Sequence, residues 1–262
     1  MISAAVILSV LTATAALATE GAEYAPIYLD KTAITLDAGY MMDIDGLTVD
    51  SLTGGSISMS YVFNRTAKSA HSIGLTFGYF EGDDDGALNT DTGEIPSYDE
   101  SGNQVGIAKS TYDVTETLSQ EILPIIVTYK YHRNITDSIS CYAGARAGIY
   151  ISKSKATRQS SFIYIDVDVV AGKAEGYGMD EKGSSSRTTI SPTLGMELGV
   201  EYQFAKNWSW HLSGSIDASY NVIRQKTLQE HSEDALWAVL TPETSKDTAV
   251  SATIRTGFTY QF

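Results

Sequence analysis

Strict alternation of apolar and polar residues recurs along most of this chain. In the first such segment, Ile34, Leu36 and Tyr40 alternate with Thr35 and Asp37. Successive side chains of a β-strand leave opposite faces, so a period of two predicts a strand, and helical periodicity is hard to find anywhere. Eight segments show the pattern: residues 31–40, 54–63, 71–80, 121–132, 138–152, 188–204, 208–222 and 250–262. The pattern therefore predicts an all-β protein with eight strands.

The connections between these segments alternate in length. Short turns are expected at residues 64–70, 133–137 and 205–207, and long loops at 43–54, 82–112, 154–186 and 224–247. A soluble sandwich has no reason to sort its loops in this way. In an up-and-down barrel that spans a membrane, one rim carries short turns and the other long loops. We therefore expect a transmembrane, up-and-down antiparallel β-barrel.

The two faces of the expected strands differ in charge. No ionised residue occurs in the apolar rows, and aromatic residues gather near the ends of the strands, as in the interfacial girdles of membrane barrels. The opposite rows are rich in Gly, Ser and Thr and carry a few charges of both signs. These are Asp37, Lys130, Arg146, Glu197, Glu201, Asp217 and Arg255. We predict that they form a polar network in the lumen, because ions enclosed in a narrow barrel must be paired.

The chain ends in TIRTGFTYQF, in which Phe258, Tyr260 and Phe262 share one row. With this ending and with YAGARAGIY at 142–150, residues 31–262 resemble the small outer-membrane β-barrel family, the OmpA/OmpX-like eight-stranded barrels. The resemblance implies that these three aromatic residues form the assembly signal read by the barrel-insertion machinery. It covers only the barrel part of such proteins, and no peptidoglycan-binding domain is expected after it.

The N-terminal residues indicate export. An uncharged stretch runs to Thr19 and ends in Ala16-Leu17-Ala18, the small-x-small pattern of a signal-peptide cleavage site, although no Lys or Arg precedes the apolar run. We expect a signal peptide at 1–18, a short periplasmic segment at 19–30 and the barrel domain at 31–262. The expected location is the outer membrane of a Gram-negative cell, with membrane lipid as the immediate partner.

Composition narrows the possible partners. The formal net charge of −14 argues against nucleic-acid binding, which needs a basic patch, and acidic residues concentrate in the first two long loops. Cys141 is the only cysteine, so no internal disulfide can form. We expect a monomer without a cofactor, in which the acidic loops contact an extracellular ligand that the sequence does not identify.

Three segments of the sequence suggest catalysis, metal binding or a different number of strands. His211 and Ser213 could share a face as base and nucleophile, as in outer-membrane lipid A deacylases, but that face is the lumen and the lipid lies outside.

The acidic segment 81–94 has oxygen ligands without the spacing of an EF-hand loop, which leaves weak calcium binding open. Residues 161–170 continue the alternation and suggest either a hairpin above the membrane or a ten-stranded barrel. Gly172–Ser186 is too rich in glycine to supply the second additional strand, so eight strands are expected.

The expected function is a structural or surface-interaction role through the long acidic loops, and no enzymatic activity is expected. The alternatives are a small channel that passes ions or small solutes, a soluble exported β-sandwich and, last, a lipid-modifying enzyme. An eight-stranded barrel has room for side chains and little else, which disfavours the channel.

Overall fold

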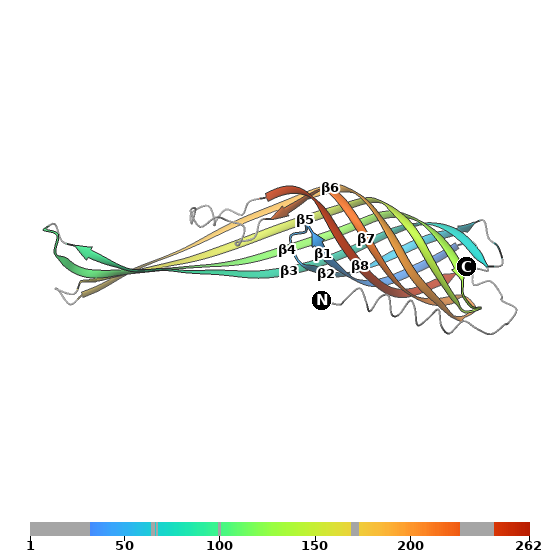
Figure 1. Cartoon of the computed structure of the whole chain (residues 1–262), viewed down its shortest axis with the longest axis horizontal. Helices are drawn as coiled ribbons and strands as arrows, with labels where there is room; N and C mark the ends of the chain where they lie inside the picture. Colours follow the sequence, from blue (N-terminus) through green and yellow to red (C-terminus); the bar gives the residue numbers. More distant parts are fainter. Residues whose placement is uncertain (1–31, 64–65, 67, 99–100, 169–172, 226–243) are drawn as a thin grey trace.

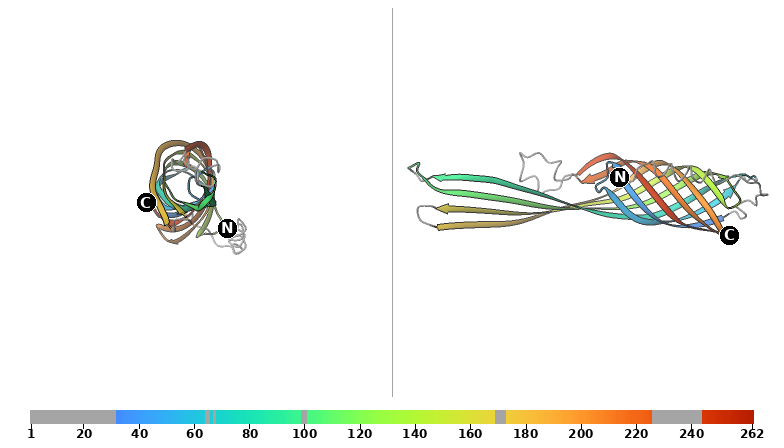
Figure 2. Two further views of the ribbon diagram at one scale, coloured as in Figure 1. Left: turned by 90° about the vertical axis from the view of Figure 1, so that its left-hand side faces the viewer. Right: turned by 60° about the horizontal axis from the view of Figure 1, so that its bottom comes forward.

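The structure is a computed structural model that describes residues 32–63, 66, 68–98, 101–168, 173–225 and 244–262. Eight strands form a closed barrel in which each strand pairs antiparallel with the next and the last pairs with the first (Figures 1 and 2). They are β1 (Thr32–Asp45), β2 (Ser51–Phe63), β3 (Ser69–Tyr98), β4 (Gln104–Asn134), β5 (Ile139–Asp168), β6 (Lys173–Ala205), β7 (Trp208–Gln225) and β8 (Thr244–Gln261). The predicted eight-stranded up-and-down barrel is confirmed. Among the described residues, no helix is long and apolar enough to cross a membrane.

The orientation of the two faces is also the expected one. Phe77, Val127 and Leu198 lie on the outside of the barrel and are each about half exposed, at 48%, 46% and 55%. Arg146 and Glu197 point inward and are buried. The apolar surface therefore faces outward, where an aqueous environment would be unfavourable and lipid acyl chains are favourable.

The short turns lie at one end of the barrel, together with the C-terminus (Figure 1). At this end β2 connects to β3, β4 to β5 and β6 to β7, in the three places where the sequence predicts short turns. Because the family resemblance implies that the last strand ends in the periplasm, we refer to this end as the periplasmic rim and to the opposite end as the outer mouth.

Two of the four expected long loops are strands. The β3–β4 ladder continues from Ser69↔Arg133 to Tyr98↔Gln104, and the β5–β6 ladder continues to Asp168↔Lys173. Residues 82–98, 104–112, 154–168 and 173–186 therefore extend the sheet instead of forming loops. The expectation that Gly172–Ser186 is too rich in glycine for a strand was wrong for residues 173–186, which belong to β6. The strand count stays at eight because these residues lengthen existing strands and form the hairpin above the membrane.

This extension is the most distinctive feature of the molecule, and we call it the blade (Figures 1 and 2). It comprises the parts of four strands beyond the outer mouth: residues 82–98 of β3, 104–120 of β4, 154–168 of β5 and 173–187 of β6. The β2–β3 ladder ends at Thr53↔Glu81, and the β6–β7 ladder ends at Thr193↔Ser219. In the ladders of the described residues, β3 and β6 are thus the two edges of a four-stranded sheet.

A buried ion pair lies where the blade leaves the barrel. Arg158 Nε donates to Glu116 Oε1 at 2.7 Å, and the two side chains are 0% and 3% exposed. The residues stand opposite each other on β5 and β4. Charges can be buried at this level only in pairs, because an isolated buried ion costs several kcal/mol. We call this level the neck of the blade.

Candidate functional site

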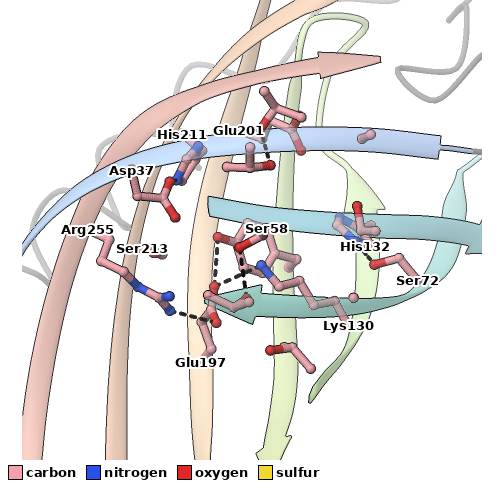
Figure 3. A pocket seen from close by; sticks show the side chains of 18 of the residues that line it. Asp37, Ser58, Ser72, Lys130, His132, Glu197, Glu201, His211, Ser213 and Arg255 are labelled. Carbon is pink, nitrogen blue, oxygen red and sulfur yellow. Dashed lines mark hydrogen bonds and ion pairs between the residues drawn. The ribbon is translucent and has the colours of Figure 1, made fainter. Parts of the chain in front are cut away.

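The barrel interior near the periplasmic rim is organised around Glu197 on β6 (Figure 3). Lys130 Nζ and Arg255 Nη2 each donate to this carboxylate at 2.9 Å, and Arg146 Nη1 donates at 3.2 Å. The hydroxyl of Tyr142 adds a fourth hydrogen bond at 3.2 Å. One buried anion is thus shared by three cations from β4, β5 and β8, which ties together strands that are not all neighbours.

A second carboxylate offsets part of the excess positive charge of this cluster. Arg146 Nε lies 3.2 Å from Asp217 Oδ1, and Tyr150 donates its hydroxyl to Asp217 Oδ2 at 2.8 Å. Asp217 is completely buried on β7. Arg146 therefore bridges Glu197 and Asp217, as a planar guanidinium with several donors is suited to do.

The two remaining predicted lumen residues lie closer to the rim. Asp37 on β1 is 2.6 Å from His211 Nε2 and accepts a hydrogen bond from Ser56 Oγ at 3.0 Å. Glu201 accepts a short hydrogen bond from Ser209 Oγ. The structure therefore places all seven predicted lumen residues inside the barrel and brings five of them, Asp217, Arg146, Glu197, Lys130 and Arg255, into one connected cluster.

A small cavity of about 60 Å³ lies among these side chains. At roughly 10–15 Å³ per water position, it can hold a few water molecules but no organic substrate. Ser72 Oγ lies 2.8 Å from His132 Nε2 at its wall, and Ser213 and His211 also line it (Figure 3). The Ser72–His132 contact therefore lies inside the barrel, where a lipid on the outer surface has no route to it.

The interior near the outer mouth contains a cluster of apolar side chains beside a few buried polar ones, which corrects the expectation of a purely polar lumen. A buried cluster here is built mainly from inward-facing strand residues: Met41, Leu52, Phe80, Leu118, Ile122, Ile126, Tyr150, Ala156, Val222 and Ala249. The segment ILPIIV at 122–127 is apolar on both faces, and this was a sequence signal for such a layer. On β4, alternation identifies the inward row only where that row is polar, at Thr128, Lys130 and His132.

The connection between β1 and β2 closes this apolar layer from above. The expected long loop at 43–54 is a short link, 46–50, whose Leu47 and Val49 join the buried cluster. Thr48 N donates to Gln120 Oε1 at 2.9 Å, and Gln225 N donates to Thr48 Oγ1 at 3.2 Å. We call residues 46–50 the strap, because they cross from one wall of the mouth toward the other.

Neither metal binding nor a calcium loop is supported in the described part of the chain. No group of three or more His, Cys, Asp or Glu residues is arranged to hold a metal ion there. Residues 81–94, which were considered for calcium, belong to β3. Consecutive residues of a strand point to opposite faces of the sheet, whereas a calcium loop wraps its ligands around one ion.

A closed antiparallel barrel with an apolar outer surface and paired ions inside is a membrane-spanning β-barrel, and barrels of this type are found in bacterial outer membranes. No known sequence family matches this chain, and no curated protein is similar to it in sequence.

Solved structures with a similar fold are outer-membrane barrels. Neisserial surface protein A aligns over 88% of this chain and 97% of its own, with 12% identity and a TM-score of 0.38. The attachment invasion locus protein Ail of Yersinia pestis aligns over 88% and 97%, with 12% identity and a TM-score of 0.33. The N-terminal barrel domain of Pseudomonas aeruginosa OprF aligns over 88% and 99%, with 13% identity and a TM-score of 0.31.

The residues of the predicted assembly signal lie on the outer surface at the periplasmic rim. Phe258 and Phe262 are about half exposed, and the ring of Tyr260 makes edge contacts with Trp208 and Phe262 at 4.9 and 5.0 Å. This placement leaves the aromatic row accessible from the membrane. The predicted signal peptide at 1–18 and the periplasmic segment at 19–30 lie outside the described residues.

Proposed function

We propose that this protein anchors the blade in the outer membrane and that the blade contacts partners outside the cell. The observation that carries this proposal is the continuous four-stranded sheet above the outer mouth. At about 3.3 Å per residue, Gly82–Tyr98 alone projects roughly 50 Å from the barrel. Ordering so many backbone residues is costly in entropy, and the lipid-embedded barrel does not need them for closure.

The interior of the barrel supports an anchoring role over transport. The Glu197 cluster fills the lumen near the periplasmic rim, and the apolar cluster with its strap fills the outer mouth. An ion crossing the barrel would have to displace both layers. The channel alternative predicts steady conductance in planar lipid bilayers, whereas we expect the intact protein to give none.

The proposal is tested by trimming the blade above its neck. Residues 88–114 and 160–181 are each replaced by Asn-Gly, a dipeptide suited to two-residue hairpins, so that the Glu116–Arg158 pair is retained. Cells that carry the intact or the trimmed protein are compared for adherence to matrix-coated surfaces and to one another. We expect the trimmed protein to lose whatever adherence the intact protein confers.

Folding of the trimmed protein is checked by its migration on gels with and without boiling, since a folded barrel resists detergent and migrates differently after heating. Equal adherence by cells with intact and trimmed barrels, both folded and equally abundant, would refute a role for the blade. Conductance by the intact protein would favour the channel instead.

A further inference from the structure

The two edges of the blade are built differently. An exposed edge strand presents unpaired N–H and C=O groups to other chains, and proteins commonly block such edges with charge, proline or bulges. The β3 edge has all three devices: the consecutive acids Asp83–Asp85, a register shift between Asp91 and Glu94, and Pro96. This edge is therefore poorly suited to pairing with another strand.

The β6 edge lacks two of these devices. Its ladder with β5 runs from Ile139↔Tyr202 to Asp168↔Lys173 without a register shift, and no proline occurs between Lys173 and Ser191. The β6–β7 ladder begins only at Thr193, so in the described residues the stretch 173–188 is an uninterrupted edge; at Thr189 the side-chain hydroxyl donates to Asn221 O of β7 at 3.3 Å. A long, regular edge of this kind is a template for an added strand.

Four of the charges along this edge are arranged antisymmetrically around Glu181. Asp180 precedes Glu181 by one residue and Lys182 follows it by one. Glu175 precedes Glu181 by six residues and Arg187 follows it by six. When two copies of this strand pair antiparallel with Glu181 at the centre, Asp180 stands opposite Lys182 of the second copy. Glu175 stands opposite Arg187 in the same register, and each pairing occurs twice. Opposite charges in directly facing positions stabilise an antiparallel pair.

One feature of this register is unfavourable. Glu181 faces its own counterpart on the two-fold axis, and like charges in facing positions destabilise a pair. Glu181, Asp180 and Lys182 are all exposed, so water and salt screen this single repulsion. Four favourable pairings outnumber it.

Antiparallel pairing of β6 also fixes how the two barrels are placed. β6 runs from the blade down into the barrel, so two antiparallel copies have their barrels at opposite ends of the joined sheet. The copies must then lie in two membranes that face each other. Glu181 is nine residues from Ile190 on the apolar exterior of the barrel, roughly 30 Å along a strand, so the membranes would be about 60 Å apart.

The length of the blade fits this arrangement. In the register centred on Glu181, Lys173 at the tip of one copy stands opposite Thr189 of the other, just before Ile190. The tip therefore reaches the outer mouth of the opposing barrel without entering its membrane-spanning part. Almost the whole open edge, 173–188, is paired in a symmetric, closed contact between two copies.

We propose that the β6 edge of the blade binds the β6 edge of a second copy in an apposed membrane, antiparallel and centred on Glu181. This inference rests on the proposed role of the blade as a contact surface. The partner that binds this edge is a second copy of the protein, because opposite charges of the two copies face each other in this register. Within one membrane, where two copies point the same way, this antiparallel contact cannot form and the barrel remains a monomer.

The test uses two complementary single substitutions in the full-length protein. Asp180→Lys makes both positions beside Glu181 positive, and Lys182→Asp makes both negative. Each variant meets like charges when it pairs with itself, whereas in a mixture every positive position of one variant faces a negative position of the other. Folded proteins are reconstituted separately into phosphatidylcholine vesicles that carry a donor or an acceptor dye, and clustering is followed by energy transfer and light scattering.

We expect unaltered protein to cluster vesicles, each variant alone to cluster them several-fold less, and a mixture of the two variants to restore clustering. High salt should weaken clustering of the unaltered protein. Lys155→Asp is the matched control, because it changes the charge equally at an exposed position of β5 opposite Ser186, one strand in from the edge. Its clustering should equal that of the unaltered protein.

The outcomes separate this inference from the proposed function. No clustering by unaltered, folded protein would overturn the self-pairing. Clustering that the single variants retain, or that their mixture fails to restore, would overturn this register. If self-pairing fails while trimming the blade still abolishes adherence of cells, the blade contacts a different partner and the proposed function stands.

Discussion

The barrel and the blade use the same strands for different purposes, and their glycines show the difference. A Cβ atom at Gly257 would overlap the carbonyl oxygen of Leu36, and one at Gly195 would overlap the Asp217 carboxylate. At Gly178 in the blade, the nearest heavy atom to such a Cβ would be 3.9 Å away. Gly257 and Gly195 allow close packing inside a narrow lumen, whereas Gly178 leaves the backbone of an edge strand open.

The two regions also place their charges differently. In the barrel, the five members of the Glu197 cluster come from five strands and satisfy one another inside a closed lumen. Among the described side chains of the blade, the Glu116–Arg158 pair at the neck is buried in this way, whereas the charges at 180, 182 and 187 on β6 face solvent. Buried charges hold the barrel closed, and exposed charges are available to another molecule.

The largest expected difference between the regions comes from one substitution made in each. Gly257→Val should prevent stable folding, because the new side chain collides with the β1 backbone across a tight ladder. Gly178→Val should change the free energy of unfolding by no more than about 0.5 kcal/mol, as is usual at open surface sites. Gel migration before and after boiling measures both, and a folded Gly257→Val barrel would contradict the comparison.

Removing the buried carboxylate of Glu197 should lower the stability of the whole barrel, whereas removing that of Glu116 should affect only the neck of the blade. Glu197→Gln leaves the buried Arg146 and Arg255 and the partly buried Lys130 short of a charge and should destabilise the barrel by about 3–5 kcal/mol. Glu116→Gln should spare the barrel and loosen the neck. Urea unfolding followed by the fluorescence of Trp208 and Trp210 on β7 reports on the barrel, and limited proteolysis reports on the blade.

Equal loss of barrel stability in the two variants would show that neck and barrel unfold as one unit. Glu121→Gln is a suitable control, because Glu121 makes an ion pair with Lys153 at 3.2 Å but both side chains are largely exposed. Such a pair contributes roughly 0–1 kcal/mol, so little change is expected.

The strap should contribute less than the Glu197 cluster but more than a half-exposed apolar residue of the blade. Replacing Leu47 and Val49 together by Ser exposes polar groups to the apolar cluster and should cost about 2–4 kcal/mol. Ile163→Ser in the blade, at a side chain that is 46% exposed, should cost less than about 1 kcal/mol. The same urea titration measures both, with proteolysis added for the blade.

The smallest effect on stability is expected at the end of the chain. Phe262→Ala removes a half-exposed ring and its edge contact with Tyr260, which should cost about 1 kcal/mol in detergent. If the terminal aromatic row is the assembly signal, the amount of folded protein in the outer membrane should nevertheless fall several-fold. Tyr98→Ala, at a 60% exposed ring of the blade, should change neither quantity. Normal assembly of the Phe262→Ala protein would remove this residue from the signal.

Some features of the interior could be predicted from sequence and others could not. All seven polar residues assigned to the lumen lie there, because alternation assigns a face to each residue of a strand. Their partners were not predictable: Glu197 meets Lys130, Arg146 and Arg255 through the curvature and stagger of a closed sheet. The apolar layer was missed because Ile122 and Ile126 alternate with residues that are equally apolar, so the pattern does not show which row faces inward.

The sequence by itself determined the class of this protein: eight strands, an apolar exterior and an ion-containing interior all follow from a period of two and from the positions of charge. Only the tertiary structure decided that residues 82–98, 104–120, 154–168 and 173–187 form a blade. These residues are polar and contain glycine, and on their own they resemble loops. They become strands because the barrel below delivers β3, β4, β5 and β6 side by side, so that each new backbone hydrogen bond extends a ladder that already exists.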